Sequence, residues 1–263
     1  MGKVILIYGD EGASRVGVSS LLKACKEKMG HPVKEIFASD IINDNILDKA
    51  AMVVFPGGVA MPYCNKLNGI GNKKIREYLK NGGVYLGICA GAYYACDRLD
   101  FHGEEYDVVD KWELEFFKGV AKGSLAELTN GRYYDESVYA KAFVPLKFDG
   151  KYSTVKEKMY YYHGGPTFIP DDKNDDSYEA IAKFENGKTA IIKGKFGNGS
   201  YFLSSIHFEL QKKYYKEIVL DKARKEEYEQ ETELYNCLND NYGNEIWEII
   251  KKEIINVRSS LLE

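Results

Sequence analysis

The sequence predicts an α/β protein in which helices cover both faces of a mostly parallel central sheet. Up to about residue 97, short apolar runs alternate with segments whose apolar residues recur at helical spacing. The links between these segments are short, and several of them contain glycine. Such alternation is typical of parallel strands that are joined by helices.

Four strands and two helices are expected in this part of the chain. The strands are "KVILIYG", "VKEIFA", "AAMVVF" and "VYLGIC", which are mostly apolar, as strands buried on both faces are. A first helix covers residues 18–29 and stops at Gly30. A second helix, "NKKIREYLKNGG", stops at Gly82. The fourth strand runs directly into "YLGICAGAYYAC".

The pattern changes after about residue 97. The segment from "DRLDFHGEEYD" to "VPLKFDG" is expected to be irregular, and the chain becomes rich in strands from about residue 152. Asn186-Gly187 predicts a tight hairpin there. The final segment has a helical period. We therefore expect one domain, residues 1–211, with a helical C-terminal extension, residues 212–263, packed on it.

Composition excludes several function classes. The 263 residues carry a net charge of -4, which provides no basic field for nucleic acid. No apolar run approaches the roughly 18 residues of a membrane span. Five cysteines, an odd number without a CxxC pair, argue against a disulfide framework and against a zinc site. We infer a reducing cytoplasm and expect neither a metal nor a cofactor.

Cys89 is the candidate nucleophile. It lies in Gly87-Ile88-Cys89-Ala90-Gly91, between an expected strand and an expected helix. A sharp strand-to-helix turn that presents a nucleophile needs glycine on both sides, because backbones approach closely there. The alternative is a tightly packed turn whose thiol has no chemical role.

A thiol nucleophile needs a base, and His207 is the best candidate among four histidines. In "SYFLSSIHFEL", His207 and Glu209 are two residues apart, so an extended strand would place both side chains on one face. Glu209 could then hold the imidazole in one tautomer. His163, in "YYYHGGP", is a candidate lining residue, since Gly164 and Gly165 allow a ligand to approach.

These motifs resemble the class I glutamine amidotransferase superfamily and, within it, the biotin-protein-ligase N-terminal-like family. The resemblance covers residues 1 to about 211 and rests on "FPGGVAMPYCNKLNG", "NGGVYLGICAGAYYAC", "ELEFFKGVAKG", "YYHGGP" and "GSYFLSSIHFEL". It implies a flavodoxin-like three-layer fold with a Cys89–His207–Glu209 triad at the carboxyl edge of the sheet. The chain departs from the usual His-Pro-Glu, because Phe208 replaces the proline.

The resulting hypothesis is a thiol hydrolase that acts on a small amide. The backbone N–H groups of Ala90 and of Gly57 or Gly58 would bind the oxyanion, and Tyr93 would line the site. No biotin ligase activity is expected, because the glycine-rich phosphate loop and catalytic lysine segment of such ligases are not recognisable. Two alternatives stay open: a catalytically silent module that binds a small molecule or partner, and a redox-sensing cysteine.

Overall fold

The computed structural model describes residues 3–260 except 154, 156, 157 and 173. The strands are β1 (Val4–Tyr8), β2 (Val33–Ile36), β3 (Ala50–Phe55), β4 (Val84–Ile88), β5 (Cys96–His102), β6 (Asp107–Lys111), β7 (Phe117–Gly123), β8 (Ala142–Phe148), β9 (Lys158–Tyr162), β10 (Thr167–Pro170), β11 (Tyr178–Phe184), β12 (Thr189–Phe196) and β13 (Gly199–Ser204). The helices are α1 (Arg15–Ala24), α2 (Ala38–Asn43), α3 (Ala60–Leu67), α4 (Ile70–Lys80), α5 (Ala90–Tyr94), α6 (Lys212–Ile218), α7 (Tyr228–Cys237) and α8 (Asn244–Ser260).

The N-terminal elements confirm the predictions from periodicity. All four expected strands form, as β1 to β4. The first helix is α1, extended by a π-helical turn, Cys25–Met29, and Gly30 ends it at a φ of 66°. The second is α4, after which Gly82 has a φ of 93°. Glycine adopts these left-handed conformations without the steric cost that a side chain would add.

The central sheet has the order β2-β1-β3-β4-β13-β12-β11-β8-β9. It is parallel from β2 to β13 and antiparallel from β13 to β9, so the prediction of a mostly parallel sheet is wrong. Parallel neighbours need a long crossover connection, whereas tight turns produce antiparallel pairs. The hairpin at Asn186-Gly187 joins β11 to β12, as its sequence predicted.

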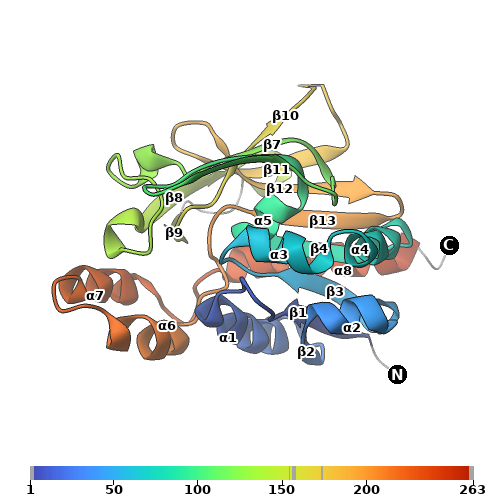
Figure 1. Cartoon of the computed structure of the whole chain (residues 1–263), viewed down its shortest axis with the longest axis horizontal. Coiled ribbons are helices and arrows are strands. Elements are labelled where there is room, and N and C mark those ends of the chain that lie inside the picture. The colour runs from blue at the N-terminus through green and yellow to red at the C-terminus, as the bar shows by residue number, and fades with distance from the viewer. Residues whose placement is uncertain (1–2, 154, 156–157, 173, 261–263) are drawn as a thin grey trace.

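A second sheet has the order β10-β7-β5-β6, and its strands β10 and β7 lie above β4 and β3 of the central sheet in Figure 1. The prediction that the segment after residue 97 is irregular is therefore wrong. The strand β7, "FKGVAKG", contains two glycines and two lysines, and it is buried at alternate positions only. Its weak local preference is overridden by packing against the rest of the molecule.

The two faces of the central sheet have separate cores. Val18 of α1 and Trp247 of α8 belong to one core, together with Ile5 of β1. The helices α2, α3 and α4 pack in the other core, which also receives apolar side chains from the second sheet. In Figure 1, α6 and α7 lie beside these layers. The division at residue 211 stays a prediction, although α8 shares its core with the central sheet.

Candidate active site

The elbow places Cys89 between β4 and α5 in a conformation that few side-chain-bearing residues adopt. Cys89 has a φ of 48°. A Cβ on Gly87 would lie 2.4 Å from the Gly91 carbonyl oxygen, and one on Gly91 would lie 2.1 Å from that of Phe55. The two glycines are therefore required by close backbone contact. Strain at a single non-glycine residue is typical of functional turns.

His207 and Glu209 form a hydrogen-bonded pair at the same edge of the sheet. The distance between His207 Nδ1 and Glu209 Oε1 is 2.9 Å, and Glu209 is completely buried. The prediction that both residues lie on a strand is wrong, because β13 ends at Ser204 and they occupy the loop after it. Backbone hydrogen bonds hold this loop: His207 N–H donates to the Tyr161 carbonyl, and His207 O accepts from the Tyr242 hydroxyl.

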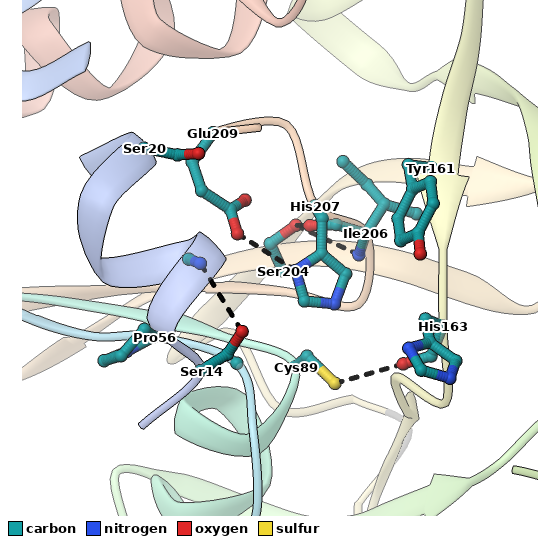
Figure 2. Close-up of polar contacts among 12 residues, drawn as sticks. Ser14, Ser20, Pro56, Cys89, Tyr161, His163, Ser204, Ile206, His207 and Glu209 are labelled. Atoms are coloured by element: carbon teal, nitrogen blue, oxygen red, sulfur yellow. Dashed lines mark hydrogen bonds and ion pairs between the residues drawn. The ribbon is translucent and has the colours of Figure 1, made fainter. Parts of the chain in front are cut away.

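Cys89 and His207 converge over Gly57. A Cβ on Gly57 would lie 2.4 Å from His207 Cε1 and 3.4 Å from Cys89 Cβ. The loop after β3 therefore leaves room for both side chains only because residue 57 is glycine. Figure 2 shows the imidazole between the Glu209 carboxylate and the Cys89 side chain, whose Sγ lies 3.4 Å from the His163 carbonyl oxygen.

The charge on His207 follows from its neighbours. Burial by itself disfavours the imidazolium, but the Glu209 carboxylate and the neighbouring Cys89 side chain outweigh burial and raise the pKa of His207 to about 10. The imidazole is then protonated near neutral pH.

Two of the predicted oxyanion donors, Gly58 and Ala90, line a pocket together with Cys89. In the part of the chain that the structure describes, their backbone N–H groups donate to no protein acceptor. Gly58 has a φ of 136°, and a Cβ there would lie 2.0 Å from the Gly12 carbonyl oxygen. Glycine is therefore needed to bring this amide beside the cysteine.

The predicted lining residues behave differently from one another. Tyr93 and Gly164 line a pocket at Cys89, and the Tyr93 hydroxyl donates to the Gly164 carbonyl at 2.9 Å. His163 also lines a pocket, and burial, with Lys141 nearby, lowers its pKa to about 3. Gly165 lines neither the pocket that contains Tyr93 nor the pocket that contains His163, since its backbone packs against Ser205.

Two pockets meet at Cys89. The apolar pocket is lined by Gly58, Val59, Ala60, Met61, Cys89, Ala90, Tyr93, Leu99, Phe101, Tyr106, Val108, Trp112, Tyr134 and Gly164. The polar pocket is lined by Gly12, Ser14, Val16, Gly17, Gly58, Val59, Cys89, Tyr134, Glu136, Lys141, Tyr161, His163, His207, Leu210, Tyr215 and Val219. Sequence reasoning missed the contribution of β5 and β6, for which the density of aromatic residues after position 97 was the available signal.

Two kinds of feature are absent from the described residues. No group of three or more His, Cys, Asp or Glu side chains there is arranged to hold a metal ion. No helix within the same residues has the length and apolar character needed to cross a bilayer.

Sequence comparisons identify relatives over most of the chain. The family model described as "Biotin-protein ligase, N terminal" matches residues 3–254. A biotin–protein ligase of Schizosaccharomyces pombe is 31% identical over 217 residues, which are 78% of this chain and 33% of that protein. The chain thus spans about a third of the length of this relative. An uncharacterized protein of Chlamydia muridarum is 27% identical over 214 residues, covering 78% of this chain and 80% of that one.

Solved structures share the fold. A glutamine amidotransferase from Thermotoga maritima superposes with a TM-score of 0.54 at 13% identity, covering 100% of this chain and 97% of that one. A chain of PurLQS from the same organism gives a TM-score of 0.53 at 14% identity, covering 80% of this chain and 89% of that one. At such low identity the likeness shows the glutamine amidotransferase-like fold alone.

Proposed function

Because the chain belongs to the biotin-protein ligase N-terminal family and has a glutamine amidotransferase-like fold, we propose that it is a thiol-dependent amide hydrolase. Cys89 is the nucleophile, His207 the general base and acid, and Glu209 the positioning residue for the imidazole. The observation that carries the proposal is the convergence of Cys89 and His207 over Gly57. Glu209 is hydrogen-bonded to Nδ1 of the same imidazole ring.

The mechanism follows from these positions. The Cys89 thiolate attacks the carbonyl carbon of the amide, and the oxyanion is bound by the N–H groups of Gly58 and Ala90. His207 then gives its proton to the departing amine as the C–N bond breaks. Water, deprotonated by His207, hydrolyses the thioester and releases the acid and the free thiol.

Thiol reactivity tests the proposal without knowledge of the substrate. Cys25, Cys64, Cys89 and Cys96 are all buried, but of these four Cys89 lines the two pockets. Cys237 is exposed, so Cys237→Ser is the suitable background. In that background, brief iodoacetamide treatment should label Cys89 first, as mass spectrometry of tryptic peptides would show. His207→Ala should slow this labelling at pH 7, because the positive charge beside the sulfur is lost.

Turnover provides the second test. Ammonia or amine release from a panel of small amides should disappear in Cys89→Ala and in His207→Ala, and the double variant should lose little more. Glu209→Gln should lose less, since nucleophile and base remain. If no amide is cleaved, no acyl adduct forms on Cys89, and ligands bind Cys89→Ala as well as wild type, the protein is a binding module instead.

A further inference from the structure

Apart from the Gly58 and Ala90 N–H groups assigned to the oxyanion and the half-exposed Tyr106 hydroxyl, the apolar pocket offers almost no polar groups to a substrate. No charged side chain is among the described residues that line it. The Tyr93 hydroxyl already donates to the Gly164 carbonyl, and the Tyr134 hydroxyl donates to Glu136. Trp112 adds one buried indole N–H, which has no hydrogen-bond partner among the described residues. A free amino acid would leave its ammonium and carboxylate groups without partners here, at a large desolvation cost.

The size of the apolar pocket limits what it can hold. Its cavity volume is ≈ 50 Å³, whereas the polar pocket has ≈ 290 Å³. A single water needs roughly 10–15 Å³ on this measure, so the apolar pocket has room for only a few non-hydrogen atoms. The larger part of a substrate must therefore lie in the polar pocket.

The position of the base decides which part of the substrate enters which pocket. His207 lines the polar pocket and is absent from the lining of the apolar pocket. The group that protonates the departing amine must be within hydrogen-bond reach of its nitrogen. The amine therefore lies on the polar side, and the acyl group extends from Cys89 in the opposite direction.

Charged side chains at the polar pocket can bind polar substituents on the departing amine. Lys141 lines this pocket and forms a buried ion pair with Glu231 of α7. Glu136 is exposed at the same pocket. Polar substituents on the amine would thus meet both signs of charge.

We propose that the substrate is an amide of a short apolar acid, with its acyl group in the apolar pocket and a polar amine in the polar pocket. This inference rests on the proposed function. Cys89 forms a C–S bond to the acyl carbon while the C–N bond breaks, and the amine leaves with the proton of His207. Water then replaces sulfur on the acyl carbon, so the short apolar acid is released.

A chain-length series tests the acyl side. Primary amides of two, four, six and eight carbons are compared with glutamine, and kcat/KM is measured by ammonia release. We expect the four-carbon amide to exceed glutamine by at least about tenfold, because each methylene in a fitting apolar pocket contributes that order of discrimination. The eight-carbon amide should fall again, since the cavity is too small.

Neighbouring valines of β6 supply a matched pair of variants. Val108 lines the apolar pocket, whereas Val109 is 74% exposed. Val108→Phe should raise KM for the four-carbon amide about tenfold, with a smaller effect on the two-carbon amide. Val109→Phe should leave all values within about twofold of wild type, as exposed substitutions usually do. Thermal shift of Cys89→Ala with the same amides reports binding without turnover.

The outcomes separate this inference from the proposed function. Amide cleavage with glutamine as the preferred substrate, or with no effect of Val108→Phe, would overturn the acyl assignment and leave the hydrolase intact. If no amide is cleaved and Cys89 forms no adduct, the hydrolase itself is wrong. Preference for the short acyl amide that Val108→Phe removes and Val109→Phe retains would support both.

Discussion

At the scale of single residues, the site depends on positions where no side chain fits. Gly57, Gly87 and Gly91 each have a neighbour within 2.4 Å of the place where a Cβ would lie. At Gly87 and Gly91 that neighbour is backbone, which cannot move aside. At Gly57 it is the His207 ring, so a methyl group there would displace this side chain rather than the backbone.

Gly57→Ala should therefore remove activity with little loss of stability. The added methyl would press on His207 Cε1 and turn the ring away from Cys89. We expect at least about a hundredfold slower turnover or Cys89 alkylation, comparable to the lower end of general-base loss. Gly30→Ala is the control: it has a φ of 66° and open space, so it costs about 1 kcal/mol of backbone strain far from the site. Equal activity losses in the two variants would contradict this role of Gly57.

The second residue-scale prediction concerns pH. The folded-state pKa of His163, about 3, lies below its usual 6.5, because burial disfavours the charged ring. The unfolded chain therefore binds a proton between these values that the native state does not, and stability falls as the pH drops from 6.5 towards 3. For His207, whose pKa is raised to about 10, the stabilisation is complete below 6.5 and is lost as the pH rises towards 10.

His163→Gln should reduce the loss of unfolding free energy that acidic pH causes. Between pH 6.5 and 4, the wild type should lose about 3 kcal/mol more unfolding free energy than the variant, at about 1.4 kcal/mol per pH unit. Urea titrations of both proteins at these two pH values measure the difference. Parallel decreases in wild type and variant would show that His163 is not kept neutral.

At the scale of elements, α8 supports the loop that carries His207 and Glu209. The ring of Phe208 packs edge-on against Trp247 of α8, with 5.0 Å between ring centroids. The Tyr242 hydroxyl, just before α8, donates to the His207 carbonyl at 2.7 Å. Phe208 thus gives the loop an apolar anchor on α8.

Trp247→Ala should weaken both stability and the site. Trp247 is fully buried, so its loss should cost about 3–5 kcal/mol of unfolding free energy. Cys89 alkylation, measured where the variant is still folded, should also slow because the His207 loop loses its anchor. Tyr228→Ala removes a half-exposed aromatic of α7 and should change neither property appreciably. Normal alkylation in folded Trp247→Ala would mean that α8 does not support the loop.

At the scale of the whole molecule, the two sheets meet around the cysteine. The central sheet supplies the elbow and the histidine loop, and β5 and β6 of the second sheet cover one side of Cys89. The apolar pocket exists only because of this covering sheet. The apolar pocket and the loop of His207 therefore come from different parts of the fold.

These 263 residues should not transfer biotin to an acceptor protein. The relative named as a ligase is matched over only 33% of its length. The turn after β1, the glycine-containing strand-to-helix turn nearest the N-terminus, carries Asp10 and Glu11, whose charges repel phosphate. Incubation with ATP, biotin and an acceptor should give no streptavidin-detectable product, with a full-length ligase as the positive control. Labelled acceptor that depends on ATP would contradict this.

Local pattern was sufficient for part of this protein. The strands β1 to β4, the helices α1 and α4, and the elbow at Cys89 follow from apolar runs and glycine positions, because parallel buried strands and tight turns leave strong local signals. The pairing of His207 with Glu209 was anticipated for the wrong reason: the two residues meet in a loop, not on a strand.

Only the tertiary structure decided the rest. The second sheet has half-exposed strands whose lysines and glycines resemble loop sequence, and long-range packing alone makes them strands. Which neighbouring strands pair antiparallel is decided by how the chain connects them in three dimensions. The convergence of Cys89, Gly57 and His207, from three distant segments, and the two pockets on either side of them are likewise products of how the layers pack.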